Sequence, residues 1–479
     1  MAWLVPDLGL ATAVVTLFYC LFIFHGYQEL FRDSDAGWHI RTGEAILATR
    51  TLPRTDRYSF SRPGQPWVAW EWAADVAVGA IHRVAGLRGV ALFYGGVIAA
   101  GVWLWFRLHW AMDGDFLVAC AMAPLVVCTC SIHWLARPHV IGWLFLMGAV
   151  LYGERVRAGK RTGWHEWPVV AVFMAAWANI HASFFLGPAV AGIYGVGALM
   201  GRWTDRTRVA WRYGALLAIA AIAPLANPYG WRLYAHVLRY LTDSELLARI
   251  REFQSFDFHS PGAGMIVATL MVGISGGALA LVCRRYEHFL LAVIFSALAL
   301  RSARALPLAA LLLLPVANGA IREIFPLPWK GYAERLRAID RRWKGYALAP
   351  FALAAAFGLL GALPAGFPPA AFPVAAYPHI PADARLFAPD LFGGYLIYRS
   401  NGTRQVYFDG RSDFYGVEFL KQYGRMVQLR AGWREDWESY HFSHALMPLD
   451  FPLAAALEEM GWRRVYQDGT VVLLARQGT

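Results

Sequence analysis

The sequence is poor in charge and in cysteine. Of its 479 residues only 16% are charged, whereas 58% are hydrophobic, and the mean hydropathy is +0.39. Soluble domains carry about 25% charged residues, so this composition excludes an ordinary soluble protein. The five cysteines lie within or at the ends of apolar runs, and therefore indicate neither a disulfide framework nor a thiolate metal site. The pair Cys128 and Cys130 is typical of helix packing.

Motifs of several soluble enzyme classes are also absent. The sequence has no Walker loop, no G-x-G-x-x-G after a strand and no H-E-x-x-H. Nucleotide hydrolysis and zinc proteolysis are therefore not supported. The net charge of +11 does not indicate a nucleic-acid partner, because in membrane proteins the excess Lys and Arg collects in cytoplasmic loops.

Long apolar runs are abundant. A helix needs ~20 mostly apolar residues to cross ~30 Å of hydrocarbon, and the shorter runs need loop residues to complete a crossing. The sequence therefore predicts a polytopic α-helical membrane protein with about eleven transmembrane helices. We expect the first run to be a retained span, since it lacks the flanks of a signal peptide. The runs lie near residues 8–30, 88–108, 116–134, 137–153, 167–183, 184–201, 212–226, 264–283, 287–300, 302–318 and 346–363.

Basic loops predict the orientation of these spans, because Lys and Arg gather on the cytoplasmic side. Counting spans between the basic loops puts residues 31–87, 227–262 and everything after 364 outside. The count requires that residues 71–86 form an interfacial helix and do not cross the membrane. The basic residues are Arg155, Arg157, Lys160 and Arg161, then Arg202, Arg206, Arg208 and Arg212, then Arg284 and Arg285, and finally those of 322–344.

The chain divides into three parts by composition. Residues 1–363 hold the spans, and residues 364–383 are rich in Pro and Ala, which predicts an extended linker. Residues 384–479 predict a small α/β domain outside the membrane. In this domain β-type runs lie at 405–408 and 464–475, helical patterns lie near 413–430 and 450–461, and Asp468-Gly469 predicts a hairpin turn.

An acid pair follows the first span. Asp33 and Asp35 precede two predicted interfacial helices, near residues 36–49 and 71–85, within the first external loop (31–87). Carboxylates at the edge of a span indicate chemistry at the boundary between water and lipid. Asp35 also stands where a carboxylate caps free N–H groups at a helix start, so a purely structural role is the alternative.

Other polar residues fall on the same predicted side and suggest one external cavity, although loop residues are polar in general. Arg137 either binds a phosphate or extends to lipid headgroups. Arg301 and Arg304 either clamp a phosphate or pyrophosphate leaving group or anchor the chain to the membrane surface. His181 either pairs with an acid or binds substrate, or it only satisfies the free groups at the helix ends. The site candidates are Asp33, Asp35, His39, Asp56, Glu71, Arg137, His139, Asn179, His181, Arg301 and Arg304. Further polar residues expected on the same side are Asn227, Tyr229, Glu252, Asp257 and His259.

Chemistry outside the membrane without ATP needs a substrate that arrives already activated. A sugar linked to a polyprenyl phosphate meets this condition, because its lipid is held in the bilayer and its phosphate is a good leaving group. A transporter would need paired broken helices near the middle of the membrane, and the sequence has no such symmetry.

The first loop resembles that of the GT-C superfamily of membrane glycosyltransferases, which use polyprenyl-phosphate sugars and include the oligosaccharyltransferases. The stretches DSDAGWHIRTGEAIL, LPRTDRYSF, PWVAWEW, ARPHV, ANIHASFFLG, NPYGWRL, REFQSFDFHSP, GGYLIY and VYFDGRSDFYG are also similar to a family of bacterial membrane proteins placed beside this group. The second resemblance covers nearly the whole chain. The resemblance to GT-C enzymes themselves is specific for residues ~1–200.

The resemblance implies a GT-C-like fold and an inverting glycosyltransferase of the bacterial cytoplasmic membrane, with its C-terminal domain in the periplasm. Asp35 would be the general base, with Asp33 as the alternative. The partners would be a polyprenyl-phosphate-linked sugar, membrane lipids, and a glycan, lipid or protein acceptor. Some relatives use a divalent metal (Mg or Mn), for which Asp56 and Glu71 are candidates.

Two departures leave alternatives open. In ARPHV the acid found in several relatives is missing and His139 stands instead, which favours a catalytically inactive GT-C-like scaffold in envelope polysaccharide assembly as the second hypothesis. Near the C-terminus, Asp409, Gly410 and Arg411 with Asp413 form either an acceptor contact or a loop salt bridge.

Overall fold

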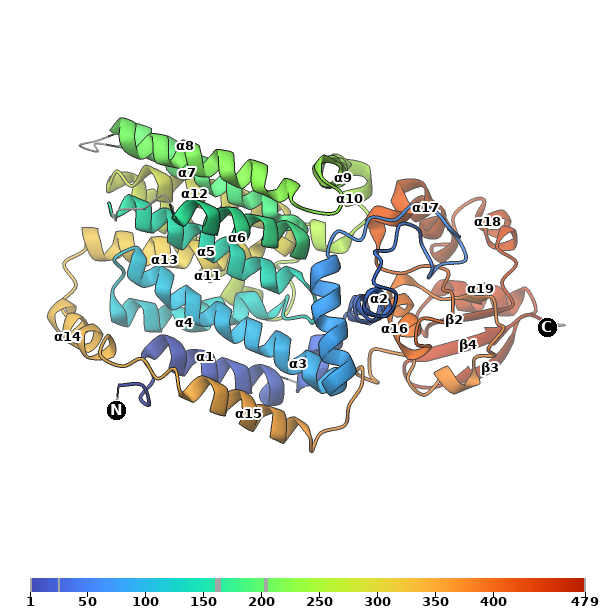
Figure 1. Cartoon of the computed structure of the whole chain (residues 1–479). Helices are drawn as coiled ribbons and strands as arrows, with labels where there is room; N and C mark the ends of the chain where they lie inside the picture. The colour runs from blue at the N-terminus through green and yellow to red at the C-terminus, as the bar shows by residue number, and fades with distance from the viewer. Residues whose placement is uncertain (1, 25, 160–164, 202–205, 478–479) are drawn as a thin grey trace.

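The computed structural model describes residues 2–24, 26–159, 165–201 and 206–477. It shows a bundle of helices with a C-terminal unit (residues 386–477) beside one end of it (Figure 1). This end of the bundle is called the site end below. Of the basic loop residues, Lys160, Arg161 and Arg202 lie outside the described residues.

Each of the eleven apolar runs lies largely in helix. Four helical segments of the described chain are long and apolar enough to cross a membrane, namely Trp72–Ala111, Ala182–Met200, Ala263–Val282 and Ala303–Ile324. These are the helices of a membrane protein, but the predicted number of eleven spans is not confirmed. The bundle consists of α1 (Leu8–Phe18), α3 (Trp72–Ala111), α4 (Phe116–Ser131), α5 (His139–Arg157), α6 (Glu166–Ile180), α7 (Leu186–Met200), α8 (Arg206–Ile222), α11 (Ala263–Val282), α12 (Tyr286–Arg301), α13 (Leu306–Ile324) and α15 (Leu348–Leu360).

Local sequence explains where several helices begin and which one is central. Asp7 accepts a hydrogen bond from Leu10 N–H, and Asp115 accepts bonds from the N–H groups of the first turn of α4, so each carboxylate satisfies donors that a helix start leaves free. Helix α13 is apolar on all sides, and nearly every residue from 306 to 320 is buried against α3, α4, α11 and α12. A helix that is apolar all round belongs in the core.

Helix α3 is broken at Gly86, whose backbone (φ 59°, ψ −160°) lies in a region that only glycine adopts readily. The part before Gly86 lies across the site end, and the part after it runs along the bundle (Figure 1). The predicted interfacial segment 71–86 is therefore a separate helical segment that meets the span at a sharp bend.

Helix α2 (Asp35–Thr49) agrees with the interfacial helix predicted near 36–49. It lies between the first part of α3 and α16 (Asp390–Arg399) of the C-terminal unit. Both contacts run through glycine: a β-carbon on Gly43 would overlap the carbonyl oxygen of Asp75, and one on Gly37 would overlap that of Gly394. Because backbone touches backbone, α2 is fixed closely on both sides.

The C-terminal unit has a four-stranded sheet in the order β1-β2-β4-β3, in which β1 and β2 are parallel and the other pairs antiparallel. The predicted hairpin is confirmed, since Asp468 between β3 and β4 accepts hydrogen bonds from Thr470 and Val471 N–H. Its elements are β1 (Leu386–Phe387), α16, α17 (Ser412–Val427), α18 (Trp433–Ser439), β2 (His444–Pro448), α19 (Pro452–Glu459), β3 (Arg463–Gln467) and β4 (Val471–Ala475).

Residues 405–408, predicted as a strand, do not join this sheet. Val406 instead forms a bridge with Ser59 of the first loop, and its N–H donates to the carbonyl of Tyr58 at 2.8 Å. This segment pairs with the first loop because the loop offers free backbone groups next to it. The C-terminal unit is thereby joined to the N-terminal part of the chain.

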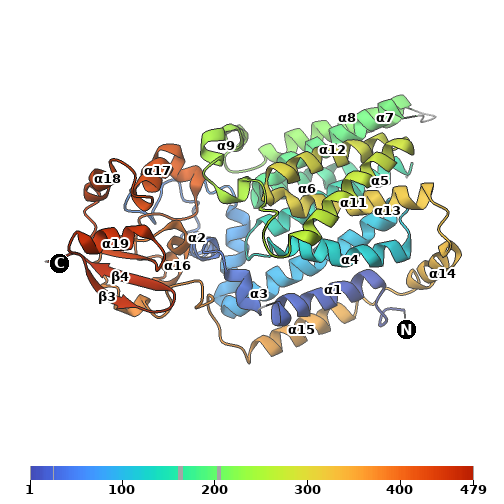
Figure 2. The same ribbon diagram turned by 180° about the vertical axis from the view of Figure 1, so that it is seen from behind.

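The remaining segments connect these parts. Helices α9 (Trp231–Thr242) and α10 (Ser244–Leu247) lie at the site end (Figure 1), and α14 (Lys330–Asp340) lies at the opposite end, as Figure 2 shows from behind. The linker (364–383) is largely without regular structure, but it packs against other parts of the chain. Its Phe367 and Phe372 are buried, and their rings contact that of Tyr395 in the C-terminal unit.

Candidate active site

A cavity of about 750 Å³ lies at the site end, between the bundle and the C-terminal unit. Its walls come from α2, the start of α3, the loops that precede α5 and α7, the segment 237–254, the ends of α12 and α13, and residues 410–413. Of the predicted site residues, those that line it are Asp35, Glu71, Arg137, His139, His181, Arg301 and Arg304.

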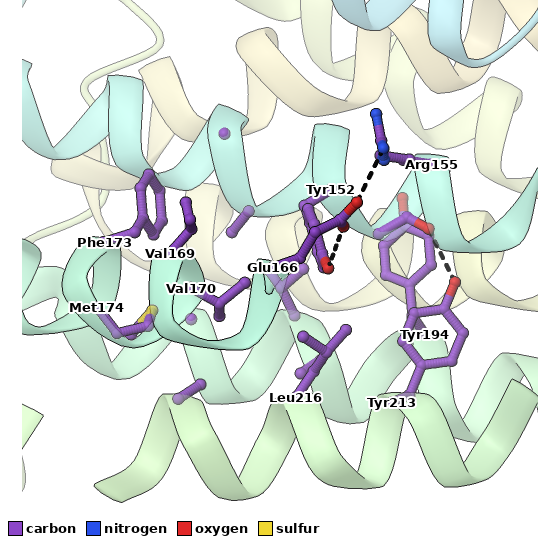
Figure 3. A pocket seen from close by; sticks show the side chains of 17 residues that line it. Tyr152, Arg155, Glu166, Val169, Val170, Phe173, Met174, Tyr194, Tyr213 and Leu216 are labelled. Carbon is purple, nitrogen blue, oxygen red and sulfur yellow. Dashed lines mark hydrogen bonds and ion pairs between the residues drawn. The ribbon is translucent and has the colours of Figure 1, made fainter. Parts of the chain in front are cut away.

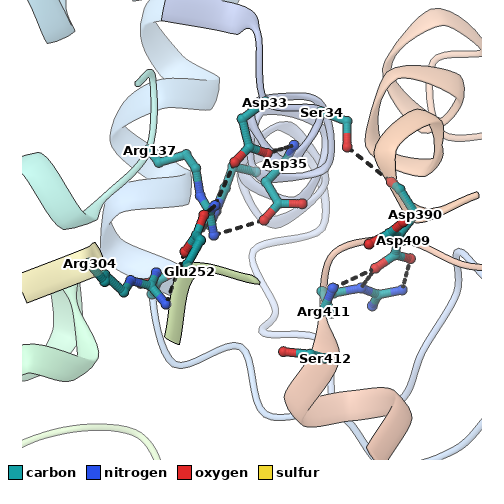
Figure 4. A network of polar contacts seen from close by, with 12 residues as sticks. Asp33, Ser34, Asp35, Arg137, Glu252, Arg304, Asp390, Asp409, Arg411 and Ser412 are labelled. Atoms are coloured by element: carbon teal, nitrogen blue, oxygen red, sulfur yellow. Dashed lines mark hydrogen bonds and ion pairs between the residues drawn. The ribbon is translucent and has the colours of Figure 1, made fainter. Parts of the chain in front are cut away.

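Arg137 joins three carboxylates on one side of the cavity (Figure 4). Its Nη1 lies 2.6 Å from Asp33 Oδ2 and 3.2 Å from Glu252 Oε1, and its Nη2 lies 2.8 Å from Asp35 Oδ2. One guanidinium therefore faces three carboxylates, so acidic side chains outnumber basic ones around Arg137. Glu252 also meets Arg304, whose Nη1 lies 3.4 Å from Glu252 Oε2.

The two acids of the pair have different tasks. Asp33 accepts a hydrogen bond from the N–H of Asp35 at 2.9 Å and so acts as the cap at the start of α2. Asp35 makes no capping bond, and its carboxylate points to Arg137 and into the cavity. The structural alternative that the sequence left open for Asp35 thus applies to Asp33 instead.

Burial sets the proton affinity of the cavity acids. It raises the pKa of Asp35 to about 7, against the lowering effect of Arg137, and Asp33 raises it further. Burial also raises the pKa of Glu71 to about 7. For Glu252 the charges of Arg304 and Arg137 outweigh burial, and its pKa falls to about 2. Asp35 and Glu71 are therefore the groups able to exchange a proton near neutral pH.

Glu71 stands between two histidines. Its Oε2 lies 3.7 Å from His39 Nε2 and its Oε1 lies 3.5 Å from His181 Nε2. His39 is buried behind the cavity wall, with Nδ1 2.6 Å from Asp75 Oδ1. Burial lowers the pKa of His181 to about 3 and that of His39 well below its usual value, so both rings are neutral.

The arginines at the junction of α12 and α13 differ in their partners. Arg304 faces Glu252, whereas Arg301 is exposed to the cavity and makes no ion pair with any described residue. Next to them the cavity wall is apolar, through Leu298, Leu308 and Val237 among others. A free guanidinium beside an apolar wall is suited to an anionic group carried on a lipid.

The C-terminal unit closes another side of the cavity. Arg411 binds Asp409 through Nε (2.8 Å) and Nη2 (2.7 Å), and its Nη1 lies 2.8 Å from Asp56 of the first loop. All three groups are buried. The salt bridge that the sequence offered as one alternative is therefore present, and it connects the first loop to the C-terminal unit. Gly410, Ser412 and Asp413 line the cavity beside it.

Four predicted site residues lie outside the cavity lining, and each supports a neighbour. Asn179 accepts a hydrogen bond from Trp72 Nε1 at 2.8 Å and donates to the carbonyls of Ala175 and Ala226. Asp56 binds Arg411, and Asp33 binds Arg137, while His39 acts behind Glu71. His139 does line the cavity, but its Nε2–H donates to the carbonyl of His133.

Asp56, one of the two residues proposed for a divalent metal, has its carboxylate oxygens engaged by other groups. Asp56 accepts hydrogen bonds from Tyr58 N–H, Ser59 N–H and the Ser59 hydroxyl, and it also pairs with Arg411, so its oxygens are occupied. Within the part of the chain that the structure describes, no group of three or more His, Cys, Asp or Glu side chains is arranged to hold a metal ion.

Sequence reasoning missed Asp75 as a member of the site, and it placed Glu252 on the external side without including it among the site residues. Asp75 stands four residues after Glu71, and this spacing puts both on one face of a helix, which is a signal that the sequence does carry. Glu252 lies more than a hundred residues from Arg137, and no local pattern indicates their pairing.

Comparisons with known proteins bear on the fold. No model of a protein family matches the chain, and no curated protein sequence does. The structure is similar to the crystal structure of the apo form of the oligosaccharyltransferase of Archaeoglobus fulgidus, with a TM-score of 0.55 and 12% sequence identity, over 92% of this chain and 69% of that one. At this identity the likeness shows the fold alone, which is similar to that of the archaeal enzyme.

Proposed function

We propose that this protein is an inverting glycosyltransferase that moves a sugar from a polyprenyl-phosphate donor to an envelope acceptor, on the periplasmic face of the bacterial cytoplasmic membrane. The main support for the proposal is the composition of the cavity. Asp35, which pairs with Arg137, and Arg301, which has no ion-pair partner among the described residues, both line it, and much of the remaining wall is apolar. The fold similar to an oligosaccharyltransferase supports the same class of reaction.

In this proposal Asp35 is the general base. It takes the proton of the acceptor hydroxyl or amine as that group attacks the anomeric carbon of the sugar, and the bond to the phosphate breaks on the opposite side. A pKa near the operating pH suits this role, and burial raises that of Asp35 to about 7. Asp33 holds Arg137 and the start of α2, and so positions the base.

Arg301 and Arg304 bind the donor phosphate, because guanidinium groups match phosphate oxygens in pairs. Glu71, His139 and His181 line the cavity and contact the sugar hydroxyls. His39, Asp56 and Asn179 are positioning residues that act through Glu71, Arg411 and Trp72. No metal is assigned a step, and the divalent metal stays a prediction.

The test is transfer by the purified full-length chain in proteoliposomes, with labelled polyprenyl-phosphate sugars and lipid and glycan acceptors. Asp35→Asn is expected to abolish transfer. Asp113→Asn, at an exposed turn of the opposite end, is the matched control and should keep full activity, because Asn tolerates the positive φ of 62° at this position. Product with inverted anomeric configuration is expected.

Full activity of the Asp35→Asn variant would refute the base assignment, and retained configuration would refute single displacement. If the wild type transfers none of the donors, the inactive scaffold becomes the better hypothesis. Deleting residues 384–479 does not separate the two hypotheses, because Gly410, Arg411 and Asp413 form part of the cavity wall.

A further inference from the structure

Helix α14 connects two apolar helices at the end of the bundle opposite the site (Figure 2). Helix α13, which is long and apolar enough to cross a membrane, ends at Ile324, and the apolar helix α15 begins at Leu348. The chain therefore leaves one membrane helix and enters the next through α14. A short helix in this position lies at the boundary between lipid and water. Residues 325–346 are called the α14 surface below.

One face of α14 is fixed to the bundle. Ala333 is buried, and Arg337 Nη2 donates a hydrogen bond to the carbonyl of Trp110 at 3.2 Å. At the end of the helix, Asp340 Oδ1 accepts a hydrogen bond from Leu8 N–H at 2.6 Å. Because these contacts come from α1 and α3, the other face of α14 is held pointing away from the bundle.

The exposed face of α14 is strongly basic. The α14 surface has six basic residues and two acidic ones. Burial, together with the charges of Arg341 and Arg322, lowers the pKa of Arg337 to about 10, which reflects the crowding of positive charge here. The side chains that are exposed and make no ion pair with any residue that the structure describes are Lys330, Arg335, Arg341 and Arg342.

Other arginines at this end of the bundle have acidic partners. Arg155 Nη2 lies 3.0 Å from Glu166 Oε1, at the edge of a cavity of about 360 Å³ between α5, α6, α7 and α8 (Figure 3). The acid of α14 itself is also engaged, since Glu334 Oε1 lies 3.1 Å from Arg322 Nη2. The exposed cations of the α14 surface are therefore left for an anion from outside the chain.

Large apolar side chains stand beside these cations. Trp329, Tyr332 and Ile339 are 40%, 54% and 50% exposed, and Trp3 of the N-terminal segment is 58% exposed. Trp and Tyr favour the level of the lipid headgroups, because one part of the ring system is apolar and another is polar. A surface that faced only water would expose these side chains at a cost.

We propose that the α14 surface binds the phosphate groups of anionic phospholipids in the leaflet at this end of the bundle. Lys and Arg clustered on an amphipathic helix next to a membrane span are typical of such binding. Trp329 and Tyr332 lie at the headgroup level beside the cations, which suits a lipid better than an acidic protein. The inference does not depend on the proposed function, because no residue of this surface lines the reaction cavity.

A titration of lipid tests the proposal without turnover. Phosphatidylglycerol is added to the delipidated full-length protein in detergent, and bound lipid is counted by native mass spectrometry. The variant that combines Arg335→Gln, Arg341→Gln and Arg342→Gln should weaken binding about tenfold or more, since each basic residue near an anionic surface contributes about fivefold. Wild-type affinity in this variant, or equal binding of the uncharged phosphatidylcholine, would overturn the proposal.

The matched control changes the same charge elsewhere. Arg430→Gln, Arg434→Gln and Arg463→Gln together remove three arginines of the C-terminal unit that are also exposed and make no ion pair with a described residue. This variant should keep the affinity of the wild type for phosphatidylglycerol. An equal loss in both triple variants would show that binding follows net charge alone, and would contradict a site at α14.

Amide hydrogen exchange of the wild-type protein locates the bound lipid. Phosphatidylglycerol should protect residues 329–346 from exchange, and added salt should weaken this protection. Protection only at residues 237–254 would place the lipid phosphate in the reaction cavity and refute the proposal. Stronger protection of 329–346 by polyprenyl phosphate would make the surface a donor site. Protection by polyglutamate, without any by phosphatidylglycerol, would make its partner an acidic protein, and either result contradicts the inference.

Discussion

Gly410 lies directly against the carboxylate of Asp35, so closely that a β-carbon at position 410 would overlap Asp35 Oδ1. The two residues come from opposite ends of the chain, one from the first loop and the other from the C-terminal unit. The acid proposed as the base is thus held from two sides, by Arg137 on the bundle and by Gly410. The C-terminal unit therefore shapes the site itself.

The first prediction concerns this contact. Gly410→Ala should lower kcat/KM by about 10–100-fold, because displacement of a catalytic group by 1 Å is sufficient for a loss of that size. Transfer assays in proteoliposomes measure it. Gly424→Ala in α17, where an added β-carbon meets no atom within 4 Å, is the control and should keep normal activity. Equal activity of the two variants would show that transfer does not depend on the position in which Gly410 holds the Asp35 carboxylate.

The second prediction concerns pH. Because burial raises the pKa of Asp35 to about 7 and the base works ionised, kcat should rise with pH through about 7 and level off above it. Asp33 raises the pKa of Asp35, so Asp33→Asn should move the midpoint to lower pH. Arg137 lowers it, so Arg137→Gln should move the midpoint to higher pH.

Glu71 must be controlled for in the same pH profiles, because burial raises its pKa to about 7 as well. Asp35 lies near enough to raise the pKa of Glu71 slightly, so the two acids influence one another. If Asp35 is the titrating group, Glu71→Gln keeps the rise of kcat with pH. A profile that becomes flat in Glu71→Gln would transfer the role of base to Glu71.

The third prediction concerns the buried salt bridge of Arg411. Arg411→Ala leaves the carboxylates of Asp56 and Asp409 buried without a cation, and should lower the free energy of unfolding by about 3–5 kcal/mol. Thermal unfolding in detergent measures the loss. Arg425→Ala removes a more exposed pair with Asp436 and should cost only about 0–1 kcal/mol.

A combined variant keeps this test decisive. The variant that combines Asp56→Asn, Asp409→Asn and Arg411→Met removes all three charges. It should recover most of the free energy of unfolding that Arg411→Ala loses, because an unpaired buried charge is the main cost. If the single and the combined variants unfold alike, the contribution of Arg411 is its packing against Trp67 and Phe414 and not its charge.

Much of the helical part follows from the sequence, because apolar runs and interfacial patterns depend on local composition. The helix near 36–49 and the hairpin at Asp468 were predicted on this basis and are present. Pairing across the chain has no such local signal. The bridge between Val406 and Ser59, which replaces the predicted strand, depends on free backbone groups that only the fold brings together.

The site shows the same division. Seven of the predicted site residues line one cavity, because polar groups at the ends of apolar runs on one side must meet at one end of a bundle. The capping alternative was predicted for Asp35, whereas the structure has the capping bond at Asp33, because both acids stand at the helix start and no local pattern separates them. The contact of Gly410 with Asp35 could not be predicted either, because no sequence pattern indicates which side chain a glycine contacts.

The last prediction separates phosphate binding from membrane anchoring for the arginines near α12. Arg301 lines the cavity without an ion-pair partner among the described residues, so its charge is free for a ligand. Arg301→Gln should raise KM for the donor by about 10-fold or more with little change in kcat, as expected for a lost charged hydrogen bond of about 1.5–3 kcal/mol. Arg251→Gln is the matched control, because Arg251 is exposed at the same end but does not line the cavity. If Arg301 is a surface anchor, the two variants should have the same KM for the donor and the same binding to vesicles. If Arg301 binds the phosphate, only Arg301→Gln should raise the KM for the donor. Added salt should then reduce the difference in KM between this variant and the wild type.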